Sequence, residues 1–336
     1  MIATASLGAP AGPGLLPAPT AESAAPALRR SVGHALRRIL VATDGSAMAD
    51  AAFGAAAALA ARSGASVEVL TVLPPVMAVA PEIGFVGDLP FAAMERDRRE
   101  TLLAEVRQQM RTASADALGW PIELQAGHPA ATITRVAHDR RIDLVVQGIG
   151  LHRPIDRVFG HETVLQVVRL TDAAVLAVCP PFVTLPRRAM VALDFSRSSI
   201  EAARRTLDVV AAGARVTLVH VDPHTEVASA QEQADEEIYT RGLDGLFGRL
   251  LSELVPPPGV VLETAVLRGE RMRELLAFAD RERVDLIAVG NHGHSFFERM
   301  LMGSVVMKVV RSARCSVLIT PPEPARGLGP AGSRSI

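Results

Sequence analysis

Short apolar runs recur along the chain between glycine, proline and charged residues, and stretches with helical spacing separate them. The clearest run, 284–290, has four consecutive apolar residues before Gly290. Such a run predicts a strand buried on both faces, as in a parallel sheet. Similar strands are predicted at 37–44, 67–73, 122–126, 142–148 and 174–178, with helices to about Arg62, over 92–118, to near Arg140 and from about Glu162. This alternation predicts a doubly wound α/β sheet.

The pattern then restarts. Residues 189–196 echo the first strand and its turn, and residues 141–148 align without a gap with 283–290. The chain is therefore predicted to be a tandem repeat of one α/β domain, with copies at 36–180 and 187–321 and a linker around Pro180 to Pro186. Residues 1–33, rich in Ala, Pro and Gly, are predicted to be a disordered leader, and residues 322–336 a flexible tail.

Glycines and a serine follow the strand at 284–290. Gly290 and Gly293 mark a turn at which backbone can approach a ligand, and Gly303-Ser304 opens a predicted helix at 305–311. A helix start offers unpaired N–H groups and partial positive charge, which suit a phosphate group. The Ser304 hydroxyl adds a donor at the same end. The stretch therefore predicts an anion-binding site.

The spacing Gly-x-x-Gly, nine residues, Gly-Ser resembles the nucleotide-binding signature of the universal stress protein family. The resemblance covers about residues 36–321, in two copies. It implies a five-stranded parallel sheet flanked by helices in each domain, with ATP bound where the first and fourth strands part. It also implies pairing of domains through their last strands, which one tandem chain can make internally, and it leaves a homodimer open.

Carried over residue by residue, the resemblance assigns an ATP site to the second copy. Asp194 is expected near the adenosine or a Mg²⁺ ion, and the backbone of Val221 is expected to meet adenine. The predicted site consists of Ala192, Asp194, Val221, Gly290, Gly293, Gly303, Ser304 and Val305.

The first copy departs from this pattern. Leu151, His161 and Glu162 occupy the positions of Gly293, Gly303 and Ser304. A leucine side chain blocks backbone approach, and a carboxylate repels phosphate strongly where water is excluded. The first copy is therefore predicted to be a structural partner, or to bind something less anionic than ATP.

Composition narrows the function further. The net charge of −1 and the scarcity of aromatic residues argue against a nucleic-acid binder, and Lys308, the single lysine, does not form a P-loop. Two cysteines, Cys179 and Cys315, make no disulfide framework, and no apolar run reaches the ~18 residues of a membrane helix. A cytoplasmic protein is predicted. His220 and His224 are four apart but not on one helical face, so no metal site is predicted.

The favoured function is an ATP-binding regulatory module that acts on an unidentified protein partner. The resemblance implies a role in stress response. No residue set offers a positioned general base, so an enzyme is not predicted. The alternatives are slow ATP hydrolysis, an ATP-consuming enzyme with a second pocket around His152 and His161, and a scaffold that binds no nucleotide. An oxidoreductase with a nicotinamide cofactor is the least favoured, because no Gly-x-Gly-x-x-Gly follows either first strand.

Overall fold

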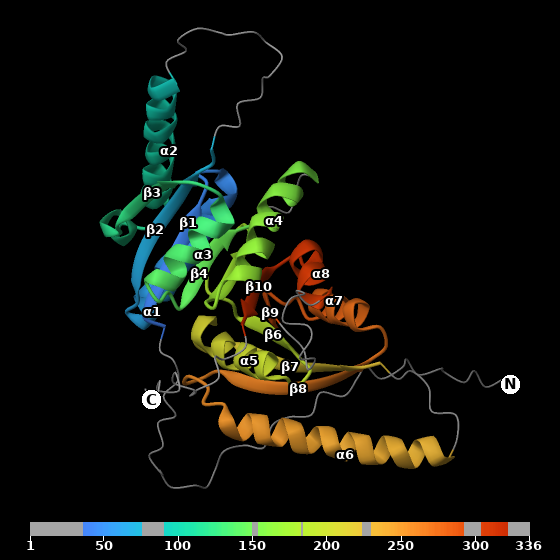
Figure 1. Ribbon diagram of the computed structural model, residues 1–336. Coiled ribbons are helices and arrows are strands. Elements are labelled where there is room, and N and C mark those ends of the chain that lie inside the picture. Colours follow the sequence, from blue (N-terminus) through green and yellow to red (C-terminus); the bar gives the residue numbers. More distant parts are fainter. Residues whose placement is uncertain are drawn as a thin grey trace, which may run out of the picture.

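A computed structural model describes residues 36–75, 91–149, 154–182, 184–223, 230–291 and 304–321 (Figure 1). The predicted leader at 1–33 and the predicted tail at 322–336 lie outside the described residues, as do Leu151, Gly293 and Gly303. Among the described residues, no helix is both long enough and apolar enough to span a membrane.

Strands and helices alternate through the first half of the chain, as predicted. They are β1 Arg38–Thr43, η1 Ala47–Ala49, α1 Asp50–Ser63, β2 Ser66–Leu73, α2 Phe91–Ala113, η2 Asp116–Gly119, β3 Ile122–Ala126, α3 Pro129–Asp139, β4 Leu144–Gly148, α4 Pro154–Leu170 and β5 Ala174–Val178.

The second half repeats the order. Its elements are β6 Arg188–Leu193, α5 Arg197–Val209, β7 Arg215–Asp222, α6 Ala230–Glu253, β8 Val261–Arg268, α7 Arg271–Arg281, β9 Leu286–Gly290, α8 Ser304–Ser312 and β10 Ser316–Thr320.

One ten-stranded sheet runs through the molecule in the order β3-β2-β1-β4-β5-β10-β9-β6-β7-β8. Pairing is parallel within each half, and β5 meets β10 in antiparallel register, with Leu176 opposite Leu318. The doubly wound fold with two five-stranded parallel halves is therefore confirmed. The internal pairing of the last strands is also present, and it merges the halves into one sheet.

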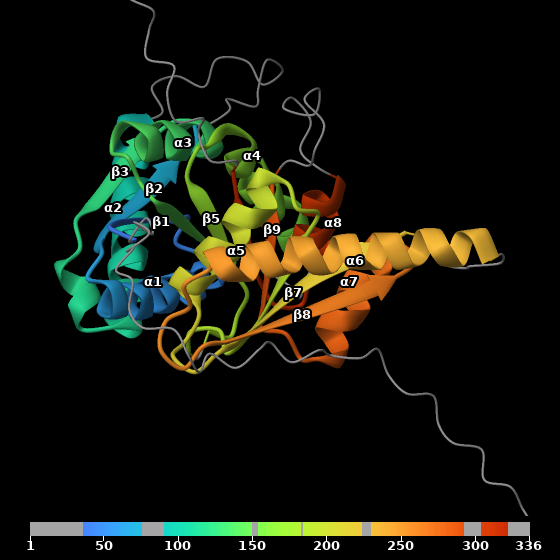
Figure 2. The same cartoon turned by 90° about the horizontal axis from the view of Figure 1, so that it is seen from below.

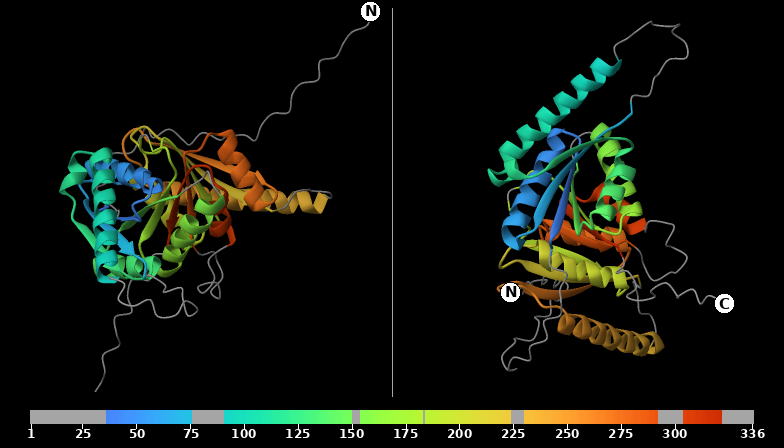
Figure 3. Two further views of the ribbon diagram at one scale, coloured as in Figure 1. Left: turned by 90° about the horizontal axis from the view of Figure 1, so that it is seen from above. Right: turned by 60° about the vertical axis from the view of Figure 1, so that its left-hand side comes forward.

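Helices cover both faces of this sheet, as Figures 1 and 2 show. One apolar core lies between the sheet and α1, α2, α5 and α6, and includes Phe53, Met110 and Phe247. The other lies under α3, α4, α7 and α8, and includes Ile133, Phe278 and Val309. The long helices α2 and α6 lie at the two ends of the molecule (Figure 3).

The repeated Arg-Ile-Asp and Arg-Val-Asp segments have a structural role in each half. Asp143 accepts hydrogen bonds from the backbone N–H groups of Arg37 and Arg38, both at 2.9 Å. Asp285 accepts equivalent bonds from Arg187 and Arg188, at 2.9 and 3.0 Å. Each aspartate thereby fixes the start of the strand next to its own, β1 or β6, which sets the register around the cavity described below.

One element boundary differs markedly from prediction. Helix α4 begins at Pro154 rather than near Glu162. Proline is well suited to the first helical position, because the N–H group that it lacks has no intrahelical acceptor there. The earlier start places His161 and Glu162 inside the helix instead of at its beginning.

Candidate functional site

Each half of the sheet has a cavity where the strand order reverses. β1 lies between β2 and β4, and β6 lies between β7 and β9. In open α/β sheets, ligands bind outside the carboxyl ends of the strands at such switch points. Because β5 and β10 run antiparallel, the carboxyl ends of the two halves lie at opposite edges of the continuous sheet.

The second-half cavity has a volume of about 140 Å³ and lies between the ends of β6 and β9. The predicted site residues that line it are Ala192, Asp194, Val221, Gly290 and Val305. Ser304 is the first residue of α8, although its side chain is not among the described ones, and Gly293 and Gly303 lie outside the described residues. These five predicted residues therefore lie together around one cavity.

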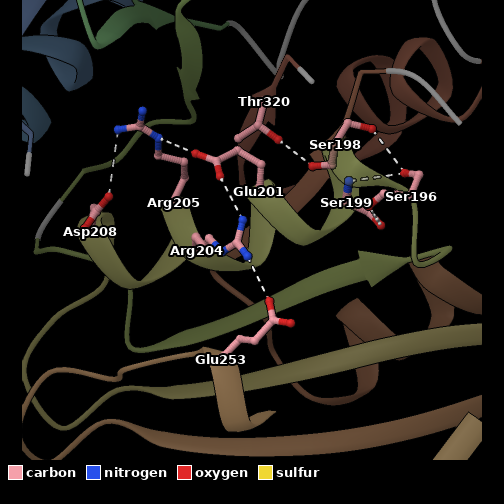
Figure 4. Close-up of polar contacts among 9 residues, drawn as sticks. All are labelled: Ser196, Ser198, Ser199, Glu201, Arg204, Arg205, Asp208, Glu253 and Thr320. Atoms are coloured by element: carbon pink, nitrogen blue, oxygen red, sulfur yellow. Dashed lines mark hydrogen bonds and ion pairs between the residues drawn. The ribbon is translucent and has the colours of Figure 1, made fainter. Parts of the chain in front are cut away.

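Asp194 is held by a tight turn between β6 and α5. Its Oδ1 accepts a hydrogen bond from the Ser196 N–H at 3.0 Å, and Ser196 Oγ caps α5 by accepting from the Ser199 N–H at 3.3 Å (Figure 4). Phe195 has φ +59°, in the left-handed region that non-glycine residues seldom adopt. Its ring lies 5.4 Å from that of His220 and 5.1 Å from that of Phe247, between centroids. These contacts hold the turn that positions Asp194.

Gly290 is required by the close approach of α5. A Cβ atom there would lie 2.5 Å from Ser198 Oγ and 2.6 Å from the Ser199 backbone nitrogen. In the first half, a Cβ on Gly148 would lie 2.0 Å from the Met48 carbonyl oxygen. A glycine therefore ends the fourth strand in both halves because the segment that follows the first strand of the same half packs directly against it, whether or not a phosphate binds nearby.

Asn291 is a cavity residue that sequence reasoning missed. Its side chain is 3% exposed, and its Nδ2 donates to the Val168 carbonyl of α4 in the first half at 3.0 Å. Its Oδ1 has no hydrogen-bond partner within the described part of the chain. An unpaired buried acceptor costs about 1–3 kcal/mol, so a ligand donor in the cavity would relieve it. The signal in the sequence was a polar residue directly after Gly290, where the first half has Ile149.

Arg271, at the start of α7, also lines the second cavity and was not predicted. Its exposed guanidinium can donate to an anionic ligand group in a bidentate manner. The aligned residue in the first half is Pro129. Among the described lining residues, Arg271 carries the positive charge and Asp194 the negative charge.

In the first half, His161 and Glu162 replace the glycine and serine that are predicted to hold phosphate in the second half. Glu162 pairs with Arg311 of α8, across the junction of the two halves. His161 is 1% exposed inside α4, and the backbone N–H groups at this point belong to the helical hydrogen-bond ladder. The first half therefore has no free helix start at the position where the second half begins α8.

The family follows from a sequence comparison. A sequence profile of the universal stress protein family matches residues 35–178 and again residues 186–321. The chain belongs to the universal stress protein family.

Relatives of this universal stress protein match either less than half of the chain or most of it. A universal stress protein of Mycolicibacterium smegmatis is 24% identical over 299 residues, covering 84% of this chain and 97% of its own. One from Methanocaldococcus jannaschii is 28% identical over 141 residues, covering 40% of this chain and 82% of its own. The crystal structure of a universal stress protein from Archaeoglobus fulgidus shares the fold, with a TM-score of 0.57 at 19% identity, covering 85% of this chain and 96% of its own.

His220 of this universal stress protein makes structural contacts. Both ring nitrogens of His220 have partners, the Leu193 carbonyl at 2.8 Å and the Tyr239 hydroxyl at 3.1 Å. His224, His292 and His294 lie outside the described residues. Within the described ranges, His, Cys, Asp and Glu side chains form no group of three that could hold a metal ion.

The two cysteines of this universal stress protein lie at the junction between its halves. Cys179 directly follows β5, Cys315 directly precedes β10, and the antiparallel register places them across from each other. Both thiols are free. Burial raises the pKa of Cys179 to about 11 and that of Cys315 to about 12, so both stay protonated at neutral pH. They act as small buried groups rather than nucleophiles.

Proposed function

We propose that the second domain of this universal stress protein binds ATP and that ATP occupancy regulates the interaction with a protein partner. The cavity at the β6–β9 switch point carries the proposal, because it gathers Asp194, Val221 and the unpaired acceptor of Asn291 beside the start of α8. We further propose domain boundaries at 36–180 and 187–321, since β5 ends at Val178 and β6 begins at Arg188.

Each part of the nucleotide has a suitable partner in this proposal. The apolar walls formed by Ala192, Val219 and Val221 suit the adenine ring, and the Asp194 carboxylate suits a ribose hydroxyl or a Mg²⁺ ion held with the phosphates. At about 140 Å³ the cavity is smaller than the ~300–1,000 Å³ of typical ligand pockets. The phosphates therefore extend out of it, toward Ser304 at the start of α8.

The chemistry of the site favours binding over catalysis. Among the described lining residues, Asp194 is the carboxylate available to activate water, and its Oδ1 already accepts from the Ser196 N–H. A carboxylate engaged in this way is a weak general base. We propose a regulatory role in stress response in the cytoplasm, with slow ATP hydrolysis as a side activity and a homodimer as a further assembly.

Calorimetric titration of ATP tests the proposal, with the double variant Gly293→Leu, Ser304→Glu, which copies the first-domain pattern into the second. We expect one ATP per chain in the natural protein and none in the variant. The matched control, Glu162→Ser, alters the aligned first-domain residue and should leave ATP binding unchanged. Binding of ATP that survives the double variant would place ATP elsewhere, and a folded protein that binds no ATP would leave only the scaffold role.

A further inference from the structure

The first domain contains a larger cavity than the second. It has a volume of about 730 Å³, lies between the carboxyl ends of β1 and β4, and is within the ~300–1,000 Å³ range of ligand pockets. Helix α2 forms one wall, through Asp97, Arg98, Thr101, Leu102 and Glu105. In the second domain, no described residue of α6 lines the corresponding cavity. The first cavity therefore has a wall of its own, built by a different helix surface.

A buried hydrogen-bond acceptor lines this cavity. Gln147 of β4 is 6% exposed, and its Oε1 has no hydrogen-bond partner in the described parts of the chain. The great majority of buried polar atoms in folded proteins are paired, and leaving one unpaired lowers stability. A ligand N–H or O–H group in the cavity would supply the missing donor. The aligned residue in the second domain is Val289, so this acceptor distinguishes the two sites.

The charges around the cavity disfavour a polyphosphate. Among the described lining residues, Asp44, Asp97 and Glu105 contribute carboxylates, against the single guanidinium of Arg98. Like charges repel strongly where protein excludes water. Helix α4 also begins at Pro154, so its backbone N–H groups beside the cavity are paired within the helix. Both features favour an uncharged or cationic ligand.

The loop that carries Asp44 is held in place before any ligand arrives. Gln109 of α2 is 7% exposed, and its Nε2 donates to the Ser46 carbonyl at 2.6 Å and to Asp50 Oδ1 at 2.9 Å. Its Oε1 accepts from Thr43 Oγ1 at 3.1 Å. A pre-formed wall reduces the entropy lost on binding. The apolar part of the lining, Ala42, Leu70, Val72 and Ile133, suits a ring system.

We propose that the first-domain cavity binds an uncharged or cationic heterocyclic molecule of nucleoside size that donates an N–H hydrogen bond to Gln147 Oε1. This is a second ligand site with a chemistry different from the ATP site proposed above, and it does not depend on that site.

Two probes that differ in one donor test the hydrogen bond. Adenosine carries an amino group that purine riboside lacks. We expect the full-length protein to bind adenosine about tenfold more tightly than purine riboside in calorimetric titration. Gln147→Val, which introduces the second-domain residue, should abolish this difference. In the Gly293→Leu, Ser304→Glu variant, ATP should bind at least tenfold more weakly than adenosine.

Hydrogen exchange then locates the bound adenosine. Backbone amides of 97–109 and 144–149 should gain protection when adenosine is added. The proposal is overturned if adenosine does not bind, if both probes bind equally to the natural protein, if Gln147→Val leaves their difference unchanged, or if protection is confined to the second domain. If Gln147→Val does not fold, the probe comparison in the natural protein decides together with the location of the added protection, because the second-domain cavity could also bind adenosine. Loss of ATP binding in the second domain would leave every one of these outcomes unaffected.

Discussion

At the scale of single residues, Gly290 and Gly148 show how one position serves both packing and the site. Each ends the fourth strand of its domain, and the backbone that follows the first strand of the same domain lies within 3 Å of the position that a Cβ atom would occupy. Each cavity is therefore lined by a glycine that close packing requires.

Gly290→Ala should destabilise the protein by about 1–3 kcal/mol, because the added methyl group would meet Ser198 and the Ser199 backbone at 2.5–2.6 Å. Denaturant unfolding measures the change. Gly242→Ala on α6 is the matched control, since nothing lies within 4 Å of its Cβ position, and it should stabilise by about 0.5–1 kcal/mol. Equal effects of the two substitutions would contradict the packing role of Gly290.

Asp208 on α5 gives the protein a pH dependence. Burial raises its pKa from 3.8 to about 6, and this outweighs the opposing attraction of Arg205, 3.9 Å away (Figure 4). A raised pKa in the folded state means that the folded protein binds the proton more tightly than the unfolded chain. The contribution of Asp208 to stability therefore falls as pH rises from about 4 to about 6. Since 34% of the Asp208 side chain is exposed, water screens part of the cost of burying its charged form.

The substitution Asp208→Asn removes this titration. The melting temperature of the variant minus that of the natural protein should therefore be more positive at pH 7 than at pH 4. Thermal melts followed by circular dichroism across this range provide the measurement. A difference that stays constant from pH 4 to pH 7 would show that the carboxyl group does not titrate there.

At the scale of elements, the two domains begin their first helices differently. Ser196 caps α5 with its side chain, whereas Ser46, at the matching turn, makes no side-chain cap bond to η1. The first-domain turn depends instead on Gln109 of α2. Both turns contain the local bond from the serine N–H to the aspartate carboxylate, at 2.9 Å in the first domain and 3.0 Å in the second. The second domain adds a side-chain cap from Ser196, and the first adds contacts from the distant helix α2.

Ser196→Ala should cost about 1 kcal/mol of stability through the lost cap, whereas Ser46→Ala should change stability by less than half of that. Denaturant midpoints of the two variants give the comparison directly. If both alanine variants lose the same stability, the side-chain cap is not what distinguishes Ser196 from Ser46.

Strand positions could be predicted from the sequence more accurately than the starts of helices or the residues that line the cavities. Residues 174–178 coincide with β5, because a fully buried strand leaves an apolar run bounded by turns. Residues 122–126 coincide with β3, a partly exposed strand at one end of the sheet, where alternating apolar and polar residues mark the strand. The start of α4 was missed because its signal, Pro154, precedes a stretch in which charged residues hide the helical period. Local patterns also cannot show which side chains of α2 face a cavity.

The described part of the second site was anticipated where it follows the repeated motif. Ala192, Asp194, Val221, Gly290 and Val305 line one cavity. Asn291 and Arg271 were missed for a physical reason. The partner of Asn291 is Val168, in the other domain, and Arg271 reaches the cavity from a helix far from the motif. Long-range contacts of this kind leave no periodic trace in the sequence. The ligand assignment itself stays a prediction.

At the scale of the whole molecule, the continuous sheet should couple the unfolding of the two domains. Trp120, the single tryptophan, is half-buried in the first domain and packs against its core. We expect Gly290→Ala, in the second domain, to lower the Trp120 fluorescence midpoint as much as the circular dichroism midpoint. A Trp120 transition that does not move while the circular dichroism transition does would indicate independent domains.

The antiparallel contact between β5 and β10 has the geometry of a two-fold dimer interface, in which the same surface meets itself. When such an interface joins identical chains, every substitution is made twice and both ligand sites must change together. Covalent fusion removes that constraint, because each site is encoded separately. Gln147 in one half corresponds to Val289 in the other, and Ile149 corresponds to Asn291, so equivalent positions differ within one chain. One chain thereby holds two unlike cavities permanently together in a fixed one-to-one ratio.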